Sequence, residues 1–132
     1  MIKKVYKIVE RYNGELFSWN TGHNSDLSVK YIPDLFVRGK ASTKLFVFDS
    51  KSNARKFIAP FGCEGSSELW EAEAVNPMKM QNMCHSSWLS AHRVCSFWNS
   101  LARKRKPVVT TSDTPKGTLV ADEVRLVKQI AW

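Results

Sequence analysis

KVYKIVERYNGELFSW, residues 4–19, is the stretch that decides the fold of this chain. Its first nine residues alternate between two sides, as expected of a β-strand. One side carries Val5, Lys7 and Val9. Asn13-Gly14 follows at once, and both residues tolerate the positive φ that a type I′ turn requires. Because residues 15–19 then form a returning strand, we expect a β-hairpin at the start of the chain.

Outward from the hairpin, alternating or apolar runs predict four further strands. They lie at residues 27–32, 44–49, 68–75 and 123–130. The run at 44–49, KLFVFD, is rich in β-forming residues and is expected at the centre of the sheet. We expect Trp70 to point inward. In the last strand, one face is expected to carry Val124, Leu126 and Ile130.

Apolar residues at steps of three and four predict two helices. The first covers residues 50–59, with Asp49 or Ser50 as its N-cap. Its core-facing residues are Ala54, Phe57 and Ile58. The second runs from residue 86 or 87 to about residue 102. Together these elements predict an α+β fold, a largely antiparallel sheet with two helices packed on it.

Length and composition are those of one globular domain, residues 1–132. Hydrophobic residues make up 43% of the chain and charged residues 24%, which is ordinary for a folded protein. No apolar run approaches the roughly 18 residues of a membrane helix. The start of the chain, MIKKVYKIVERY, lacks the apolar region of a secretory signal. We therefore expect a cytoplasmic protein without membrane contact.

The three cysteines, Cys63, Cys84 and Cys95, form no CxxC pair. Without a secretory signal they are expected to be reduced thiols. His85 and His92 extend the series to Cys84, His85, His92 and Cys95. This spacing does not match the paired ligands of common zinc sites. We therefore expect neither a metal nor another cofactor.

Charge is unevenly distributed along the chain, whose formal net charge is +8. No acid occurs between Glu73 and Asp113. That interval contains the bases Lys79, Arg93, Arg103, Lys104, Arg105 and Lys106. Such a segment attracts phosphate by Coulomb forces and counterion release. The alternative is a solvated face that keeps the protein soluble, but the tryptophans and Phe97 in the same interval favour a binding surface.

Aromatic and basic side chains alternate on or beside the second predicted helix. They are Trp88, His92, Phe97, Trp98, Arg103 and Arg105. Nucleobases stack on aromatic rings, and guanidinium groups bind phosphate in a bidentate manner. Because aromatic residues at helical spacing are usually core residues, Trp88 or Trp98 is expected to be buried. His92 and Phe97 are better placed for an exposed stacking surface.

The sequence PKGT at residues 115–118 is typical of a turn. Its backbone amides, together with Lys116 and Thr118, are suited to contact an anion. The alternative is that the turn only directs the strand that follows it. The sequence leaves both interpretations open.

One enzymatic arrangement follows the chain order of ADP-ribosyltransferases. In those enzymes an arginine holds the pyrophosphate, a Ser-Thr-Ser strand shapes the nicotinamide site, and a glutamate stabilises the transition state. The corresponding residues here are Arg11, Ser42-Thr43, Glu71 and Glu73. The sequence departs from the pattern because Lys44 follows Ser42-Thr43. Glutamates facing solvent on an amphipathic strand are the alternative.

Four stretches resemble parts of small bacteriophage proteins. They are VYKIVERYNGELFS at 5–18, LFVFDSKSNARKFI at 45–58, ELWEAEAVNP at 68–77 and PKGTLVADEVRLV at 115–127. In their core patterning they are similar to the Thoeris anti-defence family of nucleotide-signal sponges. The resemblance implies a dimer or larger oligomer that sequesters a cyclic ADP-ribose-type messenger without cleaving it. It also implies contacts from Arg125 and from residues 98–105.

The function expected from the sequence is therefore a phage-encoded protein that sequesters a phosphate-bearing nucleotide immune signal in the host bacterial cytoplasm. The signal is expected to be of the cyclic ADP-ribose type or a cyclic oligonucleotide. The expected ligand-binding residues are His92, Phe97, Trp98, Arg103, Arg105, Lys116, Thr118 and Arg125. A homo-oligomer is expected to complete the site. The alternatives are a basic DNA- or RNA-binding accessory protein and an ADP-ribosyltransferase-like enzyme.

Overall fold

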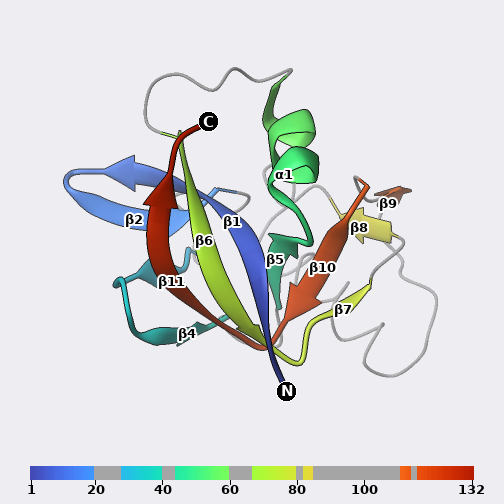
Figure 1. The fold of residues 1–132 in the computed structure, drawn as a ribbon, viewed down its shortest axis with the longest axis horizontal. Helices are drawn as coiled ribbons and strands as arrows, with labels where there is room; N and C mark the ends of the chain where they lie inside the picture. Colours follow the sequence, from blue (N-terminus) through green and yellow to red (C-terminus); the bar gives the residue numbers. More distant parts are fainter. Residues whose placement is uncertain (20–27, 40–43, 60–66, 80–81, 85–110, 114–115) are drawn as a thin grey trace.

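The computed structural model describes residues 1–19, 28–39, 44–59, 67–79, 82–84, 111–113 and 116–132 (Figure 1). These residues form a largely antiparallel β structure with one helix. The elements are β1 Ile2–Tyr12, β2 Glu15–Ser18, β3 Lys30–Tyr31, β4 Phe36–Arg38, β5 Leu45–Phe48, α1 Lys51–Ile58, β6 Ser67–Val75, β7 Met78–Lys79, β8 Asn82–Cys84, β9 Thr111–Asp113, β10 Thr118–Ala121 and β11 Glu123–Ile130. None of the described helices has the length and apolar character needed to cross a bilayer.

The main sheet has the strand order β4-β11-β6-β1-β5-β10-β7, and β2 connects β1 to β3. All of the pairings described in it are antiparallel. The central strand β1 pairs with β6 along one edge, from Ile2↔Val75 to Glu10↔Ser67. Its other edge pairs first with β5 and then with β2. Strands β8 and β9 form a separate pair.

The predicted hairpin is confirmed by β1 and β2. Tyr12 pairs with Glu15, so that a two-residue turn connects the strands. Asn13 has φ 51° and Gly14 has φ 78°. Both values lie in the left-handed region that a type I′ turn requires. The backbone twist of this turn matches the twist of the flanking strands. The Asn-Gly pair therefore fixes the register of β1 on β2.

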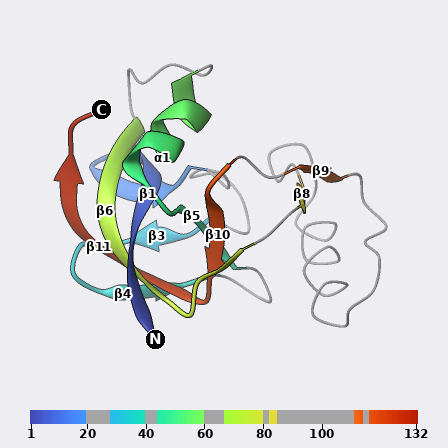
Figure 2. The same ribbon diagram turned by 45° about the vertical axis from the view of Figure 1, so that its right-hand side comes forward.

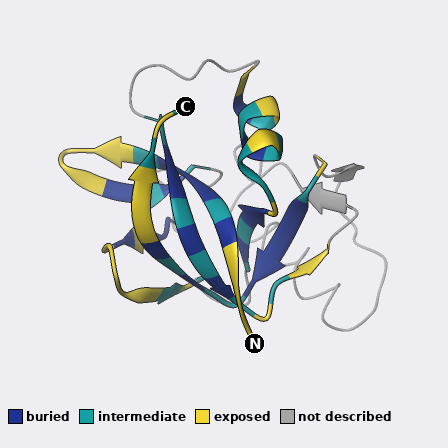
Figure 3. Cartoon of the chain, in the orientation of Figure 1, coloured by how far each residue is buried: buried dark blue, intermediate teal, exposed yellow. Residues whose placement is uncertain are grey.

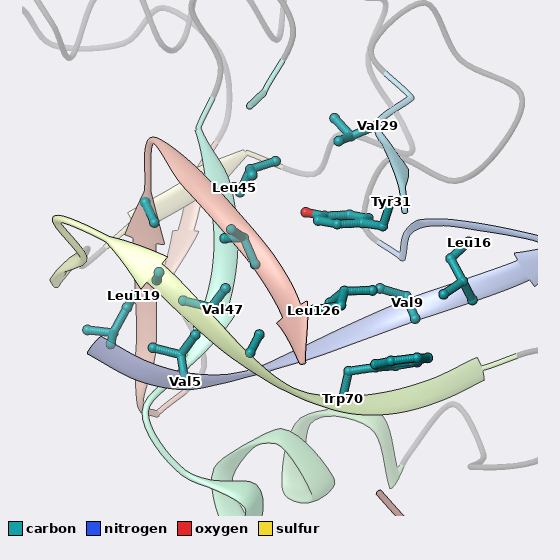
Figure 4. Close-up of a cluster of buried hydrophobic side chains, with 14 residues drawn as sticks. Val5, Val9, Leu16, Val29, Tyr31, Leu45, Val47, Trp70, Leu119 and Leu126 are labelled. Carbon is teal, nitrogen blue, oxygen red and sulfur yellow. The ribbon is translucent and has the colours of Figure 1, made fainter. Parts of the chain in front are cut away.

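One face of the sheet, here called the inner face, surrounds the larger of the apolar clusters (Figure 4). The cluster includes Val5 and Val9 of β1, Tyr31 of β3, Leu119 of β10 and Leu126 of β11. Strands from both ends of the sheet contribute to a single cluster, so the sheet curls around it (Figure 2). Trp70 is 8% exposed and belongs to this cluster, which confirms that it points inward.

The opposite, outer face is partly covered by α1, which packs against β1 and β5 (Figure 2). Ala54 and Ile58 of the helix are fully buried there against Leu69. Ser50 is the N-cap, and its Oγ accepts a hydrogen bond of 3.1 Å from the backbone N–H of Asn53. The predicted helix, its cap and its core-facing residues are confirmed, with Phe57 only partly buried.

Several predicted elements differ from the structure. The second predicted helix lies outside the described residues. Of the two predicted helices, therefore, only the first is confirmed, as α1. The strand predicted at 27–32 is described only as Lys30–Tyr31. Ile130 packs with the α1 cluster rather than with Val124 and Leu126. The physical reason is a register shift between Leu126 and Lys128, because one extra residue moves the following side chains to the other face.

Candidate functional site

The predicted ligand-binding residues fall into two groups. His92, Phe97, Trp98, Arg103 and Arg105 lie outside the described residues. The structure describes Lys116, Thr118 and Arg125. It does not bring these three residues together, since Lys116 and Thr118 flank the start of β10 and Arg125 lies on β11 between β4 and β6.

The PKGT turn packs against the start of α1. The backbone N–H of Asp49 donates to the Gly117 carbonyl over 2.9 Å. Gly117 has φ 82°, and a Cβ at this position would lie 2.3 Å from Asp49 Oδ1 and 2.4 Å from Asn53 Nδ2. Lys116 is exposed, whereas Thr118 is 7% exposed and begins β10. The turn therefore lies against the start of α1 and leaves only Lys116 of the two predicted contacts facing solvent.

Arg125 lies in a row of side chains that crosses the outer face of four strands. Register places Lys4 opposite Glu73, Glu73 opposite Arg125, and Arg125 opposite Phe36. Arg125 forms an ion pair with Glu73, and its guanidinium carbon lies 5.0 Å from the centre of the Phe36 ring. Phe36 is 38% exposed, and Arg125 is half-buried. We call Lys4, Glu73, Arg125 and Phe36 the outer-face row.

Charges around the outer-face row are balanced. Lys4 Nζ contacts Glu71 Oε1 at 2.7 Å, and Arg38 contacts Glu123 at 3.6 Å. The hydrogen bond to Glu71 raises the pKa of Lys4 above its ordinary value of 10.5. Exposed pairs of this kind contribute little to stability, about 0–1 kcal/mol each. The row and its neighbours therefore form a surface of compensated charges held by individually weak pairs.

The guanidinium of Arg125 is not fully satisfied. Its Nε is buried and has no hydrogen-bond partner among the described residues. An unpaired buried donor costs about 1–3 kcal/mol. Such groups are uncommon in folded proteins, and among the described residues the Arg55 Nε and the Tyr31 hydroxyl are in the same state. Arg125 thus combines an aromatic neighbour, an acidic neighbour and an unused donor.

The residues of the ADP-ribosyltransferase alternative do not meet in the described structure. Arg11 donates to Glu68 through Nε at 2.5 Å and through a terminal nitrogen at 3.1 Å. Glu73 lies opposite Lys4, seven residues earlier on β1, so that Arg11 and Glu73 are roughly 20 Å apart along the strands. Ser42-Thr43 lies outside the described residues. This separation weighs against a shared nucleotide site.

A buried polar pair on the inner face was not singled out from the sequence as functional. Lys7 is 2% exposed, and its Nζ donates to the Phe46 carbonyl over 2.6 Å. It also lies 5.8 Å from the centre of the Tyr31 ring. Burial lowers the pKa of Lys7 to about 7. Burial also raises the pKa of Tyr31, and an interaction with Ser18 partly opposes that shift.

The signal for Lys7 was present in the sequence. Lys7 is the one charged residue between Val5 and Val9 on the side of β1 that carries the core. For Phe36 and Glu73 a comparable signal was missing, since their meeting with Arg125 depends on the register of three strands that are distant in sequence.

One of the three cysteines, Cys84, lies within the described residues. Cys63 and Cys95 lie outside the described residues, and Cys84 belongs to β8, whose backbone alone is described. Within the described part of the chain, no group of three or more histidine, cysteine or acidic residues is arranged to hold a metal ion. Reduced cysteines and the absence of a metal stay predictions.

Comparison with known proteins adds no relative to this picture. Neither a protein-family model, nor a curated protein, nor a solved structure matches the chain.

Proposed function

We propose that the protein binds a phosphate-bearing nucleotide at the outer-face row and releases it chemically intact. The observation that carries the proposal is the position of the Arg125 guanidinium over the exposed Phe36 ring, 5.0 Å from its centre. A guanidinium group binds phosphate through paired N–H donors, and its flat face stacks on rings, including nucleobases. One arginine beside one aromatic ring thus offers both contacts that a nucleotide needs.

Glu73 has a defined part in this proposal. Its carboxylate occupies the Arg125 guanidinium in the free protein. A phosphate group must displace this carboxylate, which then turns toward Lys4, the residue opposite it on β1. The protein therefore resists weakly charged anions and accepts a ligand whose phosphate competes with a carboxylate. This exchange involves no bond cleavage.

The balanced charge of the outer-face row favours a small ligand over a polyanion at this place. Nucleic-acid binding relies on many cations along the backbone of the nucleic acid. The row and its neighbours instead pair Lys4 with Glu71, Arg38 with Glu123 and Arg125 with Glu73. The basic, acid-free residues between Glu73 and Asp113 would supply attraction over a longer range.

The resemblance to nucleotide-signal sponges suggests the class of nucleotide. We propose a cyclic ADP-ribose-type signal or a cyclic oligonucleotide, captured in the bacterial cytoplasm by a phage-encoded homo-oligomer. Arg103 and Arg105 are the additional phosphate contacts in this proposal, with His92, Phe97 and Trp98 as stacking residues. Lys116, which is exposed but does not lie with Arg125, is kept as a further phosphate contact of the proposal. Thr118 is 7% exposed and pairs with Phe48 of β5, which argues against a direct contact from this residue.

Calorimetric titration with ADP-ribose isomers and cyclic nucleotides tests the proposal. Arg125→Ala removes charged hydrogen bonds, each contributing about 1.5–3 kcal/mol, and should weaken binding by about tenfold or more. Arg38→Ala is the matched control, because Arg38 is also an ion-paired arginine near β11 but has no described stacking contact with Phe36. Equal affinity of wild type and Arg125→Ala would remove the outer-face row as the site.

The fate of the ligand separates binding from catalysis. Ligand recovered after heat denaturation of the complex should elute unchanged in chromatography. A cleaved or transferred ligand would instead support the enzymatic alternative. Arg103→Ala and Arg105→Ala, measured in the same titrations, test the contacts that lie outside the described residues.

A further inference from the structure

Lys7 lies where β1 changes its neighbour. Upstream, Tyr6 of β1 pairs with Phe48 of β5. Downstream, pairing with β2 begins at Val9↔Ser18. Lys7 falls between the two pairings, and its Nζ contacts the Phe46 carbonyl of β5 at 2.6 Å. The side chain therefore connects β1 to β5 beyond the point where their backbone pairing ends.

The surroundings of Lys7 are suited to an uncharged amine. From β1, β5 and β6 it is bordered by the apolar side chains of Val5, Val9, Val47 and Trp70. A charged ammonium group offers three donors, whereas the described contacts are one carbonyl and the Tyr31 ring. A buried charge without a paired counterion is strongly unfavourable.

Other titratable groups on the inner face are few. Tyr31 of β3 faces Lys7, and burial raises its pKa, so that it stays uncharged. Arg11 of β1 and Glu68 of β6 lie further along the strands and pair with each other. On β2, β10 and β11, the described residues of the cluster are apolar: Leu16, Leu119, Ala121, Val124 and Leu126. No described carboxylate is paired with Lys7.

We propose that Lys7 is a proton-sensitive latch on the seam between β1 and β5. The uncharged amine holds the seam closed through the Phe46 carbonyl. Protonation favours an open form in which the ammonium group reaches water and the inner face around Tyr31 becomes accessible. The latch is independent of the outer-face row, which lies on the opposite face of the sheet.

The pH dependence of the latch follows from its burial. Burial lowers the pKa of Lys7 to about 7 in the closed form, against an ordinary value of 10.5 in water. The open form therefore binds the proton more tightly than the closed form. One pKa unit corresponds to a tenfold change in the equilibrium. The opening constant should rise about tenfold per pH unit as pH falls from about 10 to about 7, and level off below 7.

Native-state hydrogen exchange of the β5 amides, corrected for the intrinsic exchange rate at each pH, measures this constant. Wild type should show the rise, and Lys7→Met should not. Lys3→Met is the matched control, since Lys3 lies on the same strand at the same side-chain parity and is exposed; it should behave as wild type. A pH-independent opening constant in wild type would overturn the latch, as would an unchanged pH dependence in Lys7→Met.

A second measurement keeps the proposal testable if Lys7→Met does not fold. In wild type, nuclear magnetic resonance of the lysine side-chain amines reports the titration of Lys7 directly. Titration near pH 7, accompanied by shifts of the β5 amide signals, supports the latch. Titration near pH 10.5, or titration near pH 7 with no response in β5, contradicts it.

Discussion

Glu73 shows how a single residue sets the state of the outer-face row. Its carboxylate is the partner of Arg125, and in the proposed function a ligand phosphate takes its place. Removing its charge by Glu73→Gln leaves Arg125 free of a competing anion. Phosphate binding should therefore become tighter, by roughly the 0.2–1 kcal/mol that an exposed pair contributes, which is a factor of about 1.5–5.

Calorimetric titration of Glu73→Gln with the nucleotide bound by wild type checks this prediction. Glu123→Gln is the control, since Glu123 pairs with Arg38 rather than with Arg125. Weaker binding of the nucleotide by Glu73→Gln would mean that Glu73 contacts the ligand itself. The proposal that the ligand phosphate displaces the Glu73 carboxylate from Arg125 would then be wrong.

At the scale of single residues, the sequence predicted part of the candidate site. Arg125 was named in advance through the resemblance, but its neighbours were not. Phe36 belongs to a three-residue strand, which is too short to show alternation. The alternation placed Lys7 on the same side of β1 as Val5 and Val9, yet its burial follows only once β3 and β5 close over it. Contacts between distant strands are a property of register, and local pattern does not encode register.

Elements with strong local signals were predicted well. The hairpin has its Asn-Gly turn, α1 has its serine cap, and β11 was predicted with the bounds Glu123–Ile130. In contrast, β10, Thr118–Ala121, was not predicted. All of its residues are buried, so the alternation that marks a half-buried strand is absent (Figure 3). Strands β4 and β7 were missed because they have only three and two residues.

The contact between the turn before β10 and the start of α1 depends on Gly117. Both Gly117 and Gly14 have a positive φ, so alanine is strained by about 1–2 kcal/mol at either position. At Gly14 the added Cβ meets nothing within 4 Å, whereas at Gly117 it collides with Asp49 and Asn53. Gly117→Ala should therefore lower the free energy of unfolding by more than Gly14→Ala does.

Urea unfolding of the two variants, followed by far-ultraviolet circular dichroism, measures the difference. The expected excess for Gly117→Ala is at least about 1 kcal/mol, because the Asn53 and Asp49 side chains must move and their hydrogen bond of 2.8 Å is lost. An equal loss in the free energy of unfolding in both variants would contradict this prediction. It would show that the turn accommodates the added methyl group without disturbing the start of α1.

At the scale of the whole molecule, exposed apolar residues gather beside the outer-face row. Ile32 and Leu35 are exposed on the turn before β4, and Val127 is exposed on β11. A hydrogen bond from the Asp34 N–H to the Leu126 carbonyl holds this turn against β11. Aromatic and apolar side chains are enriched at the centres of protein interfaces. This edge is the described surface best suited to the expected homo-oligomer.

Sedimentation equilibrium at high micromolar concentration should give at least twice the chain mass of 15.1 kDa. Leu35→Lys should shift the mass toward the monomer, because it places a charge in the interface. Lys79→Ala is the control, since Lys79 is exposed on β7, at the opposite end of the strand order from β4. A monomeric wild type would contradict the oligomer, and an oligomer unaffected by Leu35→Lys would place the interface elsewhere.

The net charge of +8 makes salt dependence the sharpest test between the two kinds of phosphate-bearing partner. A nucleic acid that engages Arg93, Arg103, Lys104, Arg105 and Lys106 would release about five counterions. The logarithm of its association constant would then fall with the logarithm of salt concentration at a slope of about −3.5 to −4.5. A small nucleotide held by Arg125 carries no condensed counterion atmosphere, so its slope should be about −1 to −2.

Titrations between 50 and 300 mM salt, with single-stranded DNA and the nucleotide as ligands, should show tighter binding and the shallower slope for the nucleotide. Tighter binding of DNA with the steep slope would replace the proposed function by nucleic-acid binding.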